Sequence, residues 1–369
     1  MRLHELPAGR LQAMRERLQR LSARTNGFTV TPRQYERVAQ LALGALTLIV
    51  LSGAAVRLTG SGLGCPDWPR CYGHAYPPLN AHALIEFSNR VITVPVSLAA
   101  GAAWLLALRR RPYRRDLARL GLLLPLGVIG QAVLGGFTVR GALDYGWVMG
   151  HFALSMLILL AAVLLVWRAR PQPGEARATE TGATARIGGL EPAPGARDRA
   201  HDRRLVTSLR ALVALGALTI FAGTAATAAG PHAGGSPGQR INRLNFDGRS
   251  TMDFVIHRHG EIALAFGLAA LGVWWLARRR RAPSSVLRPL TFLCVLLALQ
   301  GLVGLDQYKT HLPTELVWVH VGLACGAWLA ALWAACAAGA FEPARARFIA
   351  DRRSKRPVRA PGLLKNPGN

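Results

Sequence analysis

The sequence is poor in acidic residues and in cysteine. Its 369 residues include 19 Asp and Glu against 45 Lys and Arg, and only five Cys. So few cysteines in a chain of this length exclude a small secreted domain held together by disulfides. The formal charge of +26 is common among nucleic-acid-binding proteins. Here, however, the basic residues alternate with long apolar runs and form no single patch. We therefore exclude a soluble DNA-binding protein and expect no nucleic-acid partner.

Charge is nearly absent from eight stretches, each long enough to cross a hydrocarbon core of about 30 Å at roughly 1.5 Å per residue. No alternating pattern with segments of about 10 residues suggests a β-barrel, whereas a spanning helix satisfies its own backbone hydrogen bonds. The sequence therefore predicts an all-α integral membrane protein. We place its eight transmembrane helices at residues 36–57, 83–108, 117–139, 147–168, 206–228, 253–277, 286–306 and 315–341.

The basic residues are distributed unevenly between the two sides of the predicted membrane. Thirty-six Lys and Arg fall in the two tails and in the connections after the second, fourth and sixth helices, against nine on the other side. The positive-inside rule then places both termini in the cytoplasm of a multi-pass protein of the cell (plasma) membrane. The first apolar run begins only after an Arg-rich tail, so we expect no cleavable signal. The basic tails are expected to contact anionic membrane lipid.

Two features divide the chain into halves. Residues 169–205 are rich in Gly, Ala, Pro and Arg, which predicts a flexible cytoplasmic linker. Sequence landmarks also recur at a shift of 168 or 169 residues, which indicates a parallel internal repeat. The repeated pairs are Thr59–Gly62 with Thr227–Gly230, Asn89-Arg90 with His257-Arg258, Gln131 with Gln300, and His151 with His320. We expect two pseudo-symmetric four-helix bundles, 36–168 and 206–341, between basic tails at 1–35 and 342–369.

Histidines lie near the predicted outer ends of three spans. A histidine inside a span is costly unless it has a partner, so His151, His257 and His320 are functional candidates; a simple hydrogen bond to a neighbouring helix is the alternative for each. His257 and His320 lie on the second and fourth helices of one half, where facing imidazoles can hold haem iron. Zinc would need further ligands, and only Glu261 and His259 are near. Haem is favoured, with His259 as the alternative to His257.

The first half departs from this pattern at position 89. Asn89 stands where the repeat expects the partner of His151, and Asn is a poor ligand of haem iron. The site would then be five-coordinate, bind water or borrow another group. His82, about two turns nearer the surface, is one candidate, and His74 in the loop is a weaker one.

A carboxylate lies on the same helical face as His82 and Asn89. Glu86 is four residues after the first and three before the second, which places all three side chains on one face. It is either the structural partner of Arg57 or Arg90, or a proton acceptor over a substrate.

Two of the five cysteines share the first outer loop, GLGCPDWPRCYG. Cys65 and Cys71 are six residues apart in an oxidising compartment, which predicts a disulfide. The disulfide would be either a structural link or a labile, redox-active pair. Cys294, Cys325 and Cys336 lie in apolar spans and are predicted to be packed thiols.

These segments resemble the haem A synthases of bacterial membranes and mitochondria. The stretch from Val56 to Cys71, VRLTGSGLGCPDWPRC, is similar to the most specific motif of that family. Further similar segments are Ile85–Phe87, Gly130-Gln131 with Gly135-Gly136, and Gly230–Gly234. The resemblance covers about residues 36–341.

The resemblance implies eight spans in two halves and two haem sites. The second half would hold a haem b cofactor between His257 and His320. The first half would bind haem O and oxidise its C8 methyl group to a formyl group, with Glu86 as the essential glutamate and His151 as a ligand of the substrate haem. Asn89 falls where many members have the second His, and some actinobacterial-type members carry Asn there.

The resemblance also implies a mechanism and partners. Two successive oxidations with water-derived oxygen would make the protein an oxidoreductase acting on CH or CH2 groups. The electrons would pass through haem b to a membrane electron acceptor, and a haem O synthase would supply the substrate. Arg57, Arg90 and Arg258 would pair with haem propionates, or else extend to the membrane interface. A non-catalytic dihaem electron carrier is the alternative function, and a homo-oligomer is compatible with the sequence.

Overall fold

The computed structural model describes residues 27–171, 202–236, 238–246 and 250–342. This part of the chain contains eight long α-helices and no β-strand. Each helix is long and apolar enough to cross a membrane, so the predicted all-α membrane fold is confirmed. The helices are α2 (Pro32–Leu58), α3 (Ala81–Arg109), α4 (Arg115–Arg140), α5 (Tyr145–Ala169), α7 (Arg203–Ala229), α8 (Thr251–Arg279), α9 (Ser284–Lys309) and α10 (Thr314–Ala337).

The helix ends differ from the predicted ends by a few residues. The largest differences are four residues: α2 begins at Pro32 rather than at 36, and α10 ends at Ala337 rather than at 341. Gly339 there has a φ of +75°, and the Ala340 N–H donates to the Ala335 carbonyl oxygen at 2.9 Å. Such a left-handed glycine commonly closes the C-terminus of a helix. Most of the predicted linker and of the two predicted tails lies outside the described residues.

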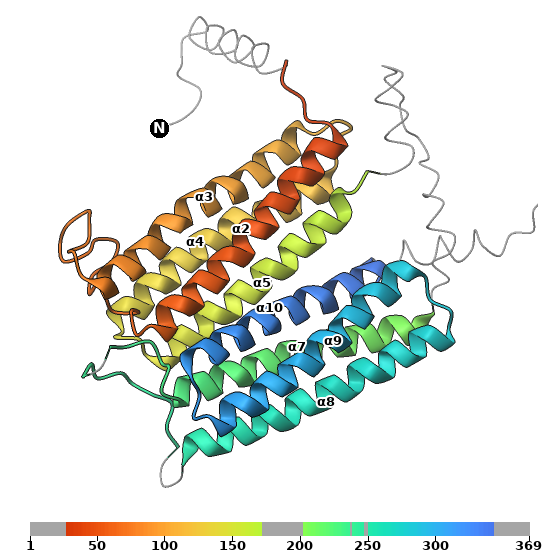
Figure 1. Ribbon diagram of the computed structural model, residues 1–369. Coiled ribbons are helices and arrows are strands. Elements are labelled where there is room, and N and C mark those ends of the chain that lie inside the picture. The colour runs from red at the N-terminus through yellow and green to blue at the C-terminus, as the bar shows by residue number, and fades with distance from the viewer. Residues whose placement is uncertain (1–26, 172–201, 237, 247–249, 343–369) are drawn as a thin grey trace, which may run out of the picture.

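The eight helices form two four-helix bundles, which confirms the predicted bundle architecture (Figure 1). In the first bundle α2, α3, α4 and α5 pack in sequence, and α5 returns to α2. In the second bundle α7, α8, α9 and α10 do the same. The bundles meet where α10 packs on α2 and α5, and where α5 packs on α7. The indole N–H of Trp328 in α10 crosses this interface and donates to the Met156 carbonyl oxygen in α5 at 3.2 Å.

The buried faces of the two bundles repeat each other, but for two of the helix pairs the shift differs from the predicted one. The buried residues of α8 match those of α3 at a shift of 170 residues. The matched pairs are Val96 with Phe266, Ala100 with Ala270, Ala103 with Val273, and Ala107 with Ala277. The buried residues of α7 match those of α2 at the same shift, whereas α10 matches α5 at the predicted 169.

This register corrects one predicted pair. At a shift of 168, Asn89 corresponds to His257; at the structural shift of 170, it corresponds to His259. Two residues turn an α-helix by about 200°. The correction therefore moves the counterpart of Asn89 to the opposite face of α8.

Candidate functional site

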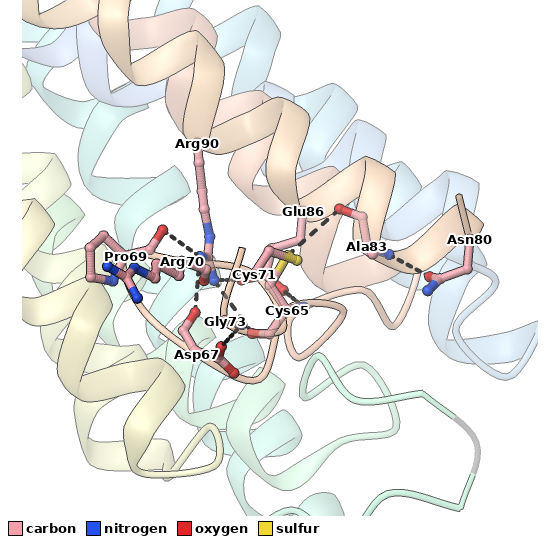
Figure 2. The surroundings of a disulfide bond; sticks show 10 residues. All are labelled: Cys65, Asp67, Pro69, Arg70, Cys71, Gly73, Asn80, Ala83, Glu86 and Arg90. Atoms are coloured by element: carbon pink, nitrogen blue, oxygen red, sulfur yellow. Dashed lines mark hydrogen bonds and ion pairs between the residues drawn. A yellow bond between two sulfur atoms is a disulfide. The ribbon is translucent and has the colours of Figure 1, made fainter. Parts of the chain in front are cut away.

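Glu86 lies near the N-terminal end of α3, the end that the sequence predicts to be outer and that is called outer below. It is buried beneath the loop between α2 and α3 (Figure 2). The residue is only 6% exposed. The backbone N–H of Cys65 donates to Oε2 at 2.7 Å, and Nη2 of Arg90 pairs with Oε1 at 2.5 Å. Both carboxylate oxygens therefore have a partner, and the pairing with Arg90 is one of the two roles expected from the sequence.

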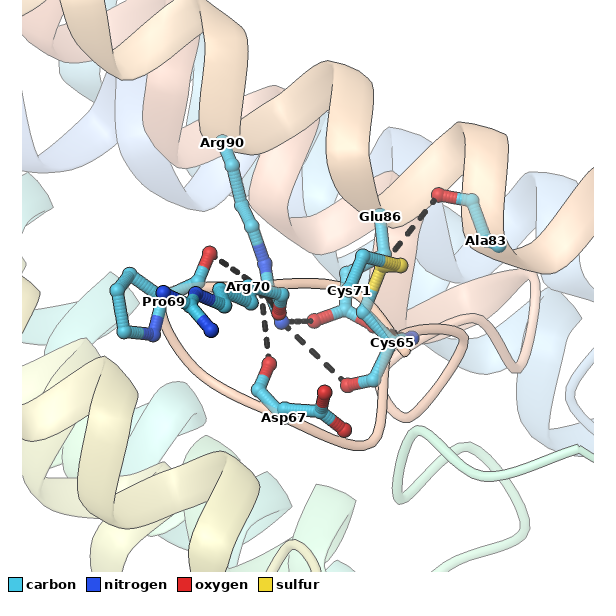
Figure 3. A network of polar contacts seen from close by, with 8 residues as sticks. All are labelled: Cys65, Asp67, Pro69, Arg70, Cys71, Ala83, Glu86 and Arg90. Carbon is cyan, nitrogen blue, oxygen red and sulfur yellow. Dashed lines mark hydrogen bonds and ion pairs between the residues drawn. A yellow bond between two sulfur atoms is a disulfide. The ribbon is translucent and has the colours of Figure 1, made fainter. Parts of the chain in front are cut away.

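Arg90 holds the same loop in place through its backbone carbonyls (Figure 3). Its Nη1 donates to the carbonyl oxygens of Asp67 at 3.0 Å and Arg70 at 2.9 Å, and its Nη2 lies 3.4 Å from that of Cys65. The expected contact of Arg90 with a haem propionate is not supported, because the loop and Glu86 already use this guanidinium. Arg90 instead fixes the loop over the carboxylate.

The predicted disulfide between Cys65 and Cys71 is present, and both residues are fully buried. They pack against Ala83 and Phe87 of α3. Cys71 and His74 exchange backbone hydrogen bonds of 3.0 and 3.1 Å, which close the end of the loop. The disulfide thus holds the loop against the turn of α3 that carries Glu86.

The loop also reaches across to α4. A Cβ atom on Gly136 of α4 would lie 3.3 Å from the Trp68 ring, so the indole packs directly on the helix backbone. Nη2 of Arg140 lies 3.5 Å from the Trp68 carbonyl oxygen. The segment from Gly64 to His74 therefore covers the outer ends of both α3 and α4.

Gly64 sets how closely the loop can approach Glu86. A Cβ atom at this position would overlap the His82 backbone carbonyl in the first turn of α3. We expect Gly64→Ala to push the loop outward, lengthen the hydrogen bond from Cys65 to Glu86, and destabilise the fold by about 1–3 kcal/mol. The midpoint temperature of thermal unfolding should fall. Gly101→Ala is the matched control, because its Cβ would meet no atom within 4 Å. Equal stability of the two variants would contradict this account.

His151 and His320 occupy equivalent positions in the two bundles. A Cβ on Gly135 would lie 3.6 Å from Cε1 of His151, and one on Gly304 would lie 3.3 Å from Cε1 of His320. Nδ1 of each histidine is buried and has no hydrogen-bond partner. Glycine on α4 and α9 thus leaves room for an imidazole from α5 and α10.

A glutamine fixes the backbone beside the His151 imidazole. Nε2 of Gln131 donates to the His151 carbonyl oxygen at 2.9 Å and to Oγ of Ser155 at 2.8 Å. Oε1 of Gln131 is buried without a partner, as is Oε1 of Gln300 in the second half. The glutamines were visible in the sequence as repeat landmarks; the structure shows that each half places one at the same site.

In the second half His259, not His257, faces His320. The ring centroids of His259 and His320 are 6.2 Å apart, and Nδ1 of His259 is also buried without a partner. His257 is exposed, its ring lies beside Tyr308, and its Nδ1 is 2.7 Å from the Asp253 carbonyl oxygen. The expected pairing of His257 with His320 is therefore corrected, because His257 projects from the opposite face of α8.

The remaining first-half candidates are held by local hydrogen bonds. Oδ1 of Asn89 accepts a bond from Oγ of Ser52 in α2 at 2.7 Å, which orients the amide between α2 and α3. Nδ1 of His82 lies 3.0 Å from Oγ of the buried Ser61. His82 thus takes part in packing the outer loop against α3. His74 stacks on Tyr76 within the same loop.

The two halves are joined at their outer ends by the two glycine-rich segments noted in the sequence. The N–H of Gly62 donates to the Gly234 carbonyl oxygen at 2.8 Å, and Oγ of Ser236 donates to that of Gly60 at 2.8 Å. Nη1 of Arg57 lies 3.4 Å from the His232 carbonyl oxygen. Sequence reasoning identified both motifs but did not predict that they touch.

The residues present fit haem better than a multi-ligand metal ion. Within the described parts of the chain, no three His, Cys, Asp or Glu side chains converge on one point. Three imidazoles instead each bury a ring nitrogen that no hydrogen bond satisfies, namely those of His151, His259 and His320. An unsatisfied buried polar atom is costly, and axial bonding to haem iron uses one imidazole nitrogen.

A model of the cytochrome oxidase assembly protein family matches residues 36–332. The chain belongs to this family. A haem A synthase of Symbiobacterium thermophilum is 32% identical over 296 residues, which cover 79% of this chain and 92% of the relative. A haem A synthase of Shewanella oneidensis is 29% identical over 300 residues, or 74% and 88% of the two chains. A protoheme IX farnesyltransferase of Thermus thermophilus is 33% identical over 151 residues, or 36% of this chain and 24% of that protein. The family resemblance expected from the sequence is confirmed.

Proposed function

We propose that this protein is a haem A synthase, which oxidises the C8 methyl group of haem O to a formyl group. The observation that carries the proposal is Glu86, a buried carboxylate held by the Cys65 N–H and by Arg90 in the half that also contains His151. Similarity over nearly the whole length of proteins named haem A synthase supports the same activity.

The first half would bind the substrate. His151 would ligate the iron of haem O, since its ring nitrogen is buried and otherwise unsatisfied. The methyl group reacts with one water to give a hydroxymethyl group, two protons and two electrons. A second such step gives a gem-diol, which loses water to leave the aldehyde. The protein would thus be an oxidoreductase, and the oxygen atom that enters the product would come from water.

Glu86 would act on the reacting carbon through its negative charge. Its two hydrogen-bond partners fix the carboxylate, so it can stabilise a cationic carbon or accept the proton released by the attacking water. The loop that buries Glu86 also reduces access of bulk water, which strengthens the electrostatic interaction.

The second half would hold haem b between His259 and His320. Their facing rings and unsatisfied nitrogens support this pair over His257. When bound, haem b supplies a one-electron relay for electrons that leave the substrate. The two imidazoles would set its position close to the outer ends of α8 and α10.

A non-catalytic dihaem electron carrier would explain the histidines equally well. It would not explain why the first half buries a carboxylate where the repeat puts Ile256 in the second half. The haem A synthase relatives also match both halves of this chain. The carrier is therefore the weaker proposal.

The membrane setting and the source of substrate are part of the proposal. The excess of basic residues supports a plasma-membrane protein with both termini in the cytoplasm. Part of this chain is similar to part of a protoheme IX farnesyltransferase, which favours a partnership with the enzyme that makes haem O.

Haem analysis of the purified membrane protein tests the proposal. We expect haem b to co-purify, and haem O supplied to the oxidising protein to be converted to haem A, as measured by chromatography and mass. Haem b alone, with no conversion of haem O, would favour the electron carrier. A protein that takes up no haem would contradict both functions.

A further inference from the structure

The proposed reaction releases four electrons per haem A, so an acceptor must reach the protein. We propose that a lipid-soluble quinone binds at the outer ends of α8 and α9, between His257 and Tyr308. This inference rests on the proposed function, because it assigns the site at which the electrons leave. It starts from two polar side chains that the haem sites do not use.

His257 lies on the exposed face of α8. From Leu264 onward the exposed residues of that face are apolar: Leu264, Leu268, Leu271 and Trp275. Around His257 they are Phe254 and the ion pair of Arg258 with Glu261, at the end where the helix would meet water. An apolar stripe of this kind on a membrane helix faces lipid, so an imidazole at its end is a functional candidate. Helix α8 packs on α7 and α9 of its own bundle, and in the part of the chain that the structure describes no further helix lies over this face (Figure 1).

Tyr308 ends the corresponding stripe of α9. Its exposed companions there are Phe292, Val295, Leu299, Leu302 and Leu305. The rings of Tyr308 and His257 are 6.1 Å apart at 79°, and the Tyr308 side chain is 47% exposed. The two polar rings therefore lie together on the exposed face of the bundle, where the apolar stripes of α8 and α9 end.

Both rings keep a free polar atom. Nδ1 of His257 is engaged by the Asp253 carbonyl oxygen, which leaves the Nε2 position directed away from the helix backbone. Neither this atom nor the Tyr308 hydroxyl has a hydrogen-bond partner within the described chain. Because Nδ1–H of His257 donates to the Asp253 carbonyl oxygen, Nε2 of the neutral imidazole is an acceptor. The Tyr308 hydroxyl can donate to a quinone carbonyl oxygen, and Nε2 of His257 can accept the O–H of the quinol.

The pair is specific to the half that would hold haem b. At the structural repeat shifts, His257 corresponds to Phe87 and Tyr308 to Val139, so the first half has two apolar residues there. His257 is also only two residues from His259, the proposed ligand of haem b. Along the axis of α8 an acceptor at His257 would thus lie within one turn of His259, on the other side of the helix.

The stoichiometry is consistent with a two-electron acceptor. Each hydroxylation of the substrate methyl group releases two electrons and two protons. One quinone takes up two electrons, supplied singly through haem b, and two protons from water at the outer surface, and it leaves as the quinol with two new O–H bonds. Two quinones are therefore reduced for each haem A formed.

Reoxidation of haem b by a short-chain benzoquinone tests the site. The purified protein is reduced, mixed with the quinone, and followed by its haem b absorbance, with ferricyanide as a water-soluble comparison. Loss of one hydrogen bond should slow reoxidation by quinone roughly tenfold in His257→Ala and about three- to tenfold in Tyr308→Phe. Reoxidation by ferricyanide and the haem b spectrum should not change.

Trp275→Phe is the matched control, because it alters an exposed aromatic residue at the inner end of the same stripe. Its reoxidation by quinone should equal that of the unaltered protein. Equal quinone rates in all three variants would overturn the site. The site would also be overturned if His257→Ala changed only the oligomeric state of the protein and left its reoxidation by quinone unchanged. Either result would leave haem b content and haem A formation intact, whereas failure of the proposed function would abolish them.

Discussion

Replacing Glu86 by Gln is expected to reduce haem A formation by about 10²- to 10⁴-fold, the usual contribution of a positioned acid–base group. Gln keeps the size of the side chain but cannot carry the negative charge. It can still accept the Cys65 N–H bond, so the loop should remain seated. The measurement is haem composition after haem O is supplied, and haem O should accumulate.

Two controls separate chemistry from folding in this experiment. Arg90 loses its ionic partner in the Gln variant, but it still donates to three backbone carbonyls within 3.3 Å, which limits the loss of stability. Haem b in the second half should therefore be retained. Glu315→Gln changes an exposed carboxylate at the outer end of α10 and should leave haem A formation unchanged. Normal haem A output from Glu86→Gln would remove the role proposed for this residue.

The sequence was sufficient for the fold because the relevant signals are long and redundant. Eight uncharged stretches and the bias of basic residues each average over many positions, so an error of a few residues at one end changes nothing. The disulfide could also be predicted from the sequence, since Cys65 and Cys71 are close together in the chain and share a loop. Glu86 was identifiable as the carboxylate nearest the unusual Asn89.

The first choice of the imidazole that faces His320 was His257 rather than His259, because this choice depends on register rather than on composition. Asn-Arg and His-Arg are similar dipeptides, and aligning them gave a shift of 168. The helix interiors contain the better signal: the buried small residues of α3 and α8 match at 170. The exposed face that carries Leu264 and Leu268 also carries His257, so its exposed position was present in the sequence pattern.

The contacts of the arginines could not be predicted because they depend on loop geometry. Arg90 binds backbone carbonyls of a loop whose path is set by the disulfide and by Trp68 on Gly136. Arg57 reaches the His232 carbonyl from the other half of the chain. Neither partner carries a side-chain signal that sequence patterning can detect. Arg258, by contrast, forms a local pair with Glu261 at 2.7 Å.

The corrected register leads to the second large effect: His259→Ala should lose haem b, and His257→Ala should keep it. Removing even an outer partner of a metal ligand lowers affinity by about 10- to 100-fold, so loss of a direct ligand should cost more than about tenfold. Haem stoichiometry and the reduced-minus-oxidised spectrum of each purified variant measure this. His320→Ala should behave like His259→Ala, because the two imidazoles would bind the same iron.

The comparison is informative because the two histidines differ mainly in the face of α8 that they occupy. His257 and His259 lie within one helical turn of each other, so a general disturbance of α8 would affect the two variants alike. Haem b lost from both would indicate such a disturbance and would remove the distinction. Haem b lost only from His257→Ala would restore the pairing suggested by the His-Arg dipeptide, and it would also remove the quinone site. Loss only from His259→Ala would mean that His257 is free to serve at the exposed face of α8, where the electrons are proposed to leave.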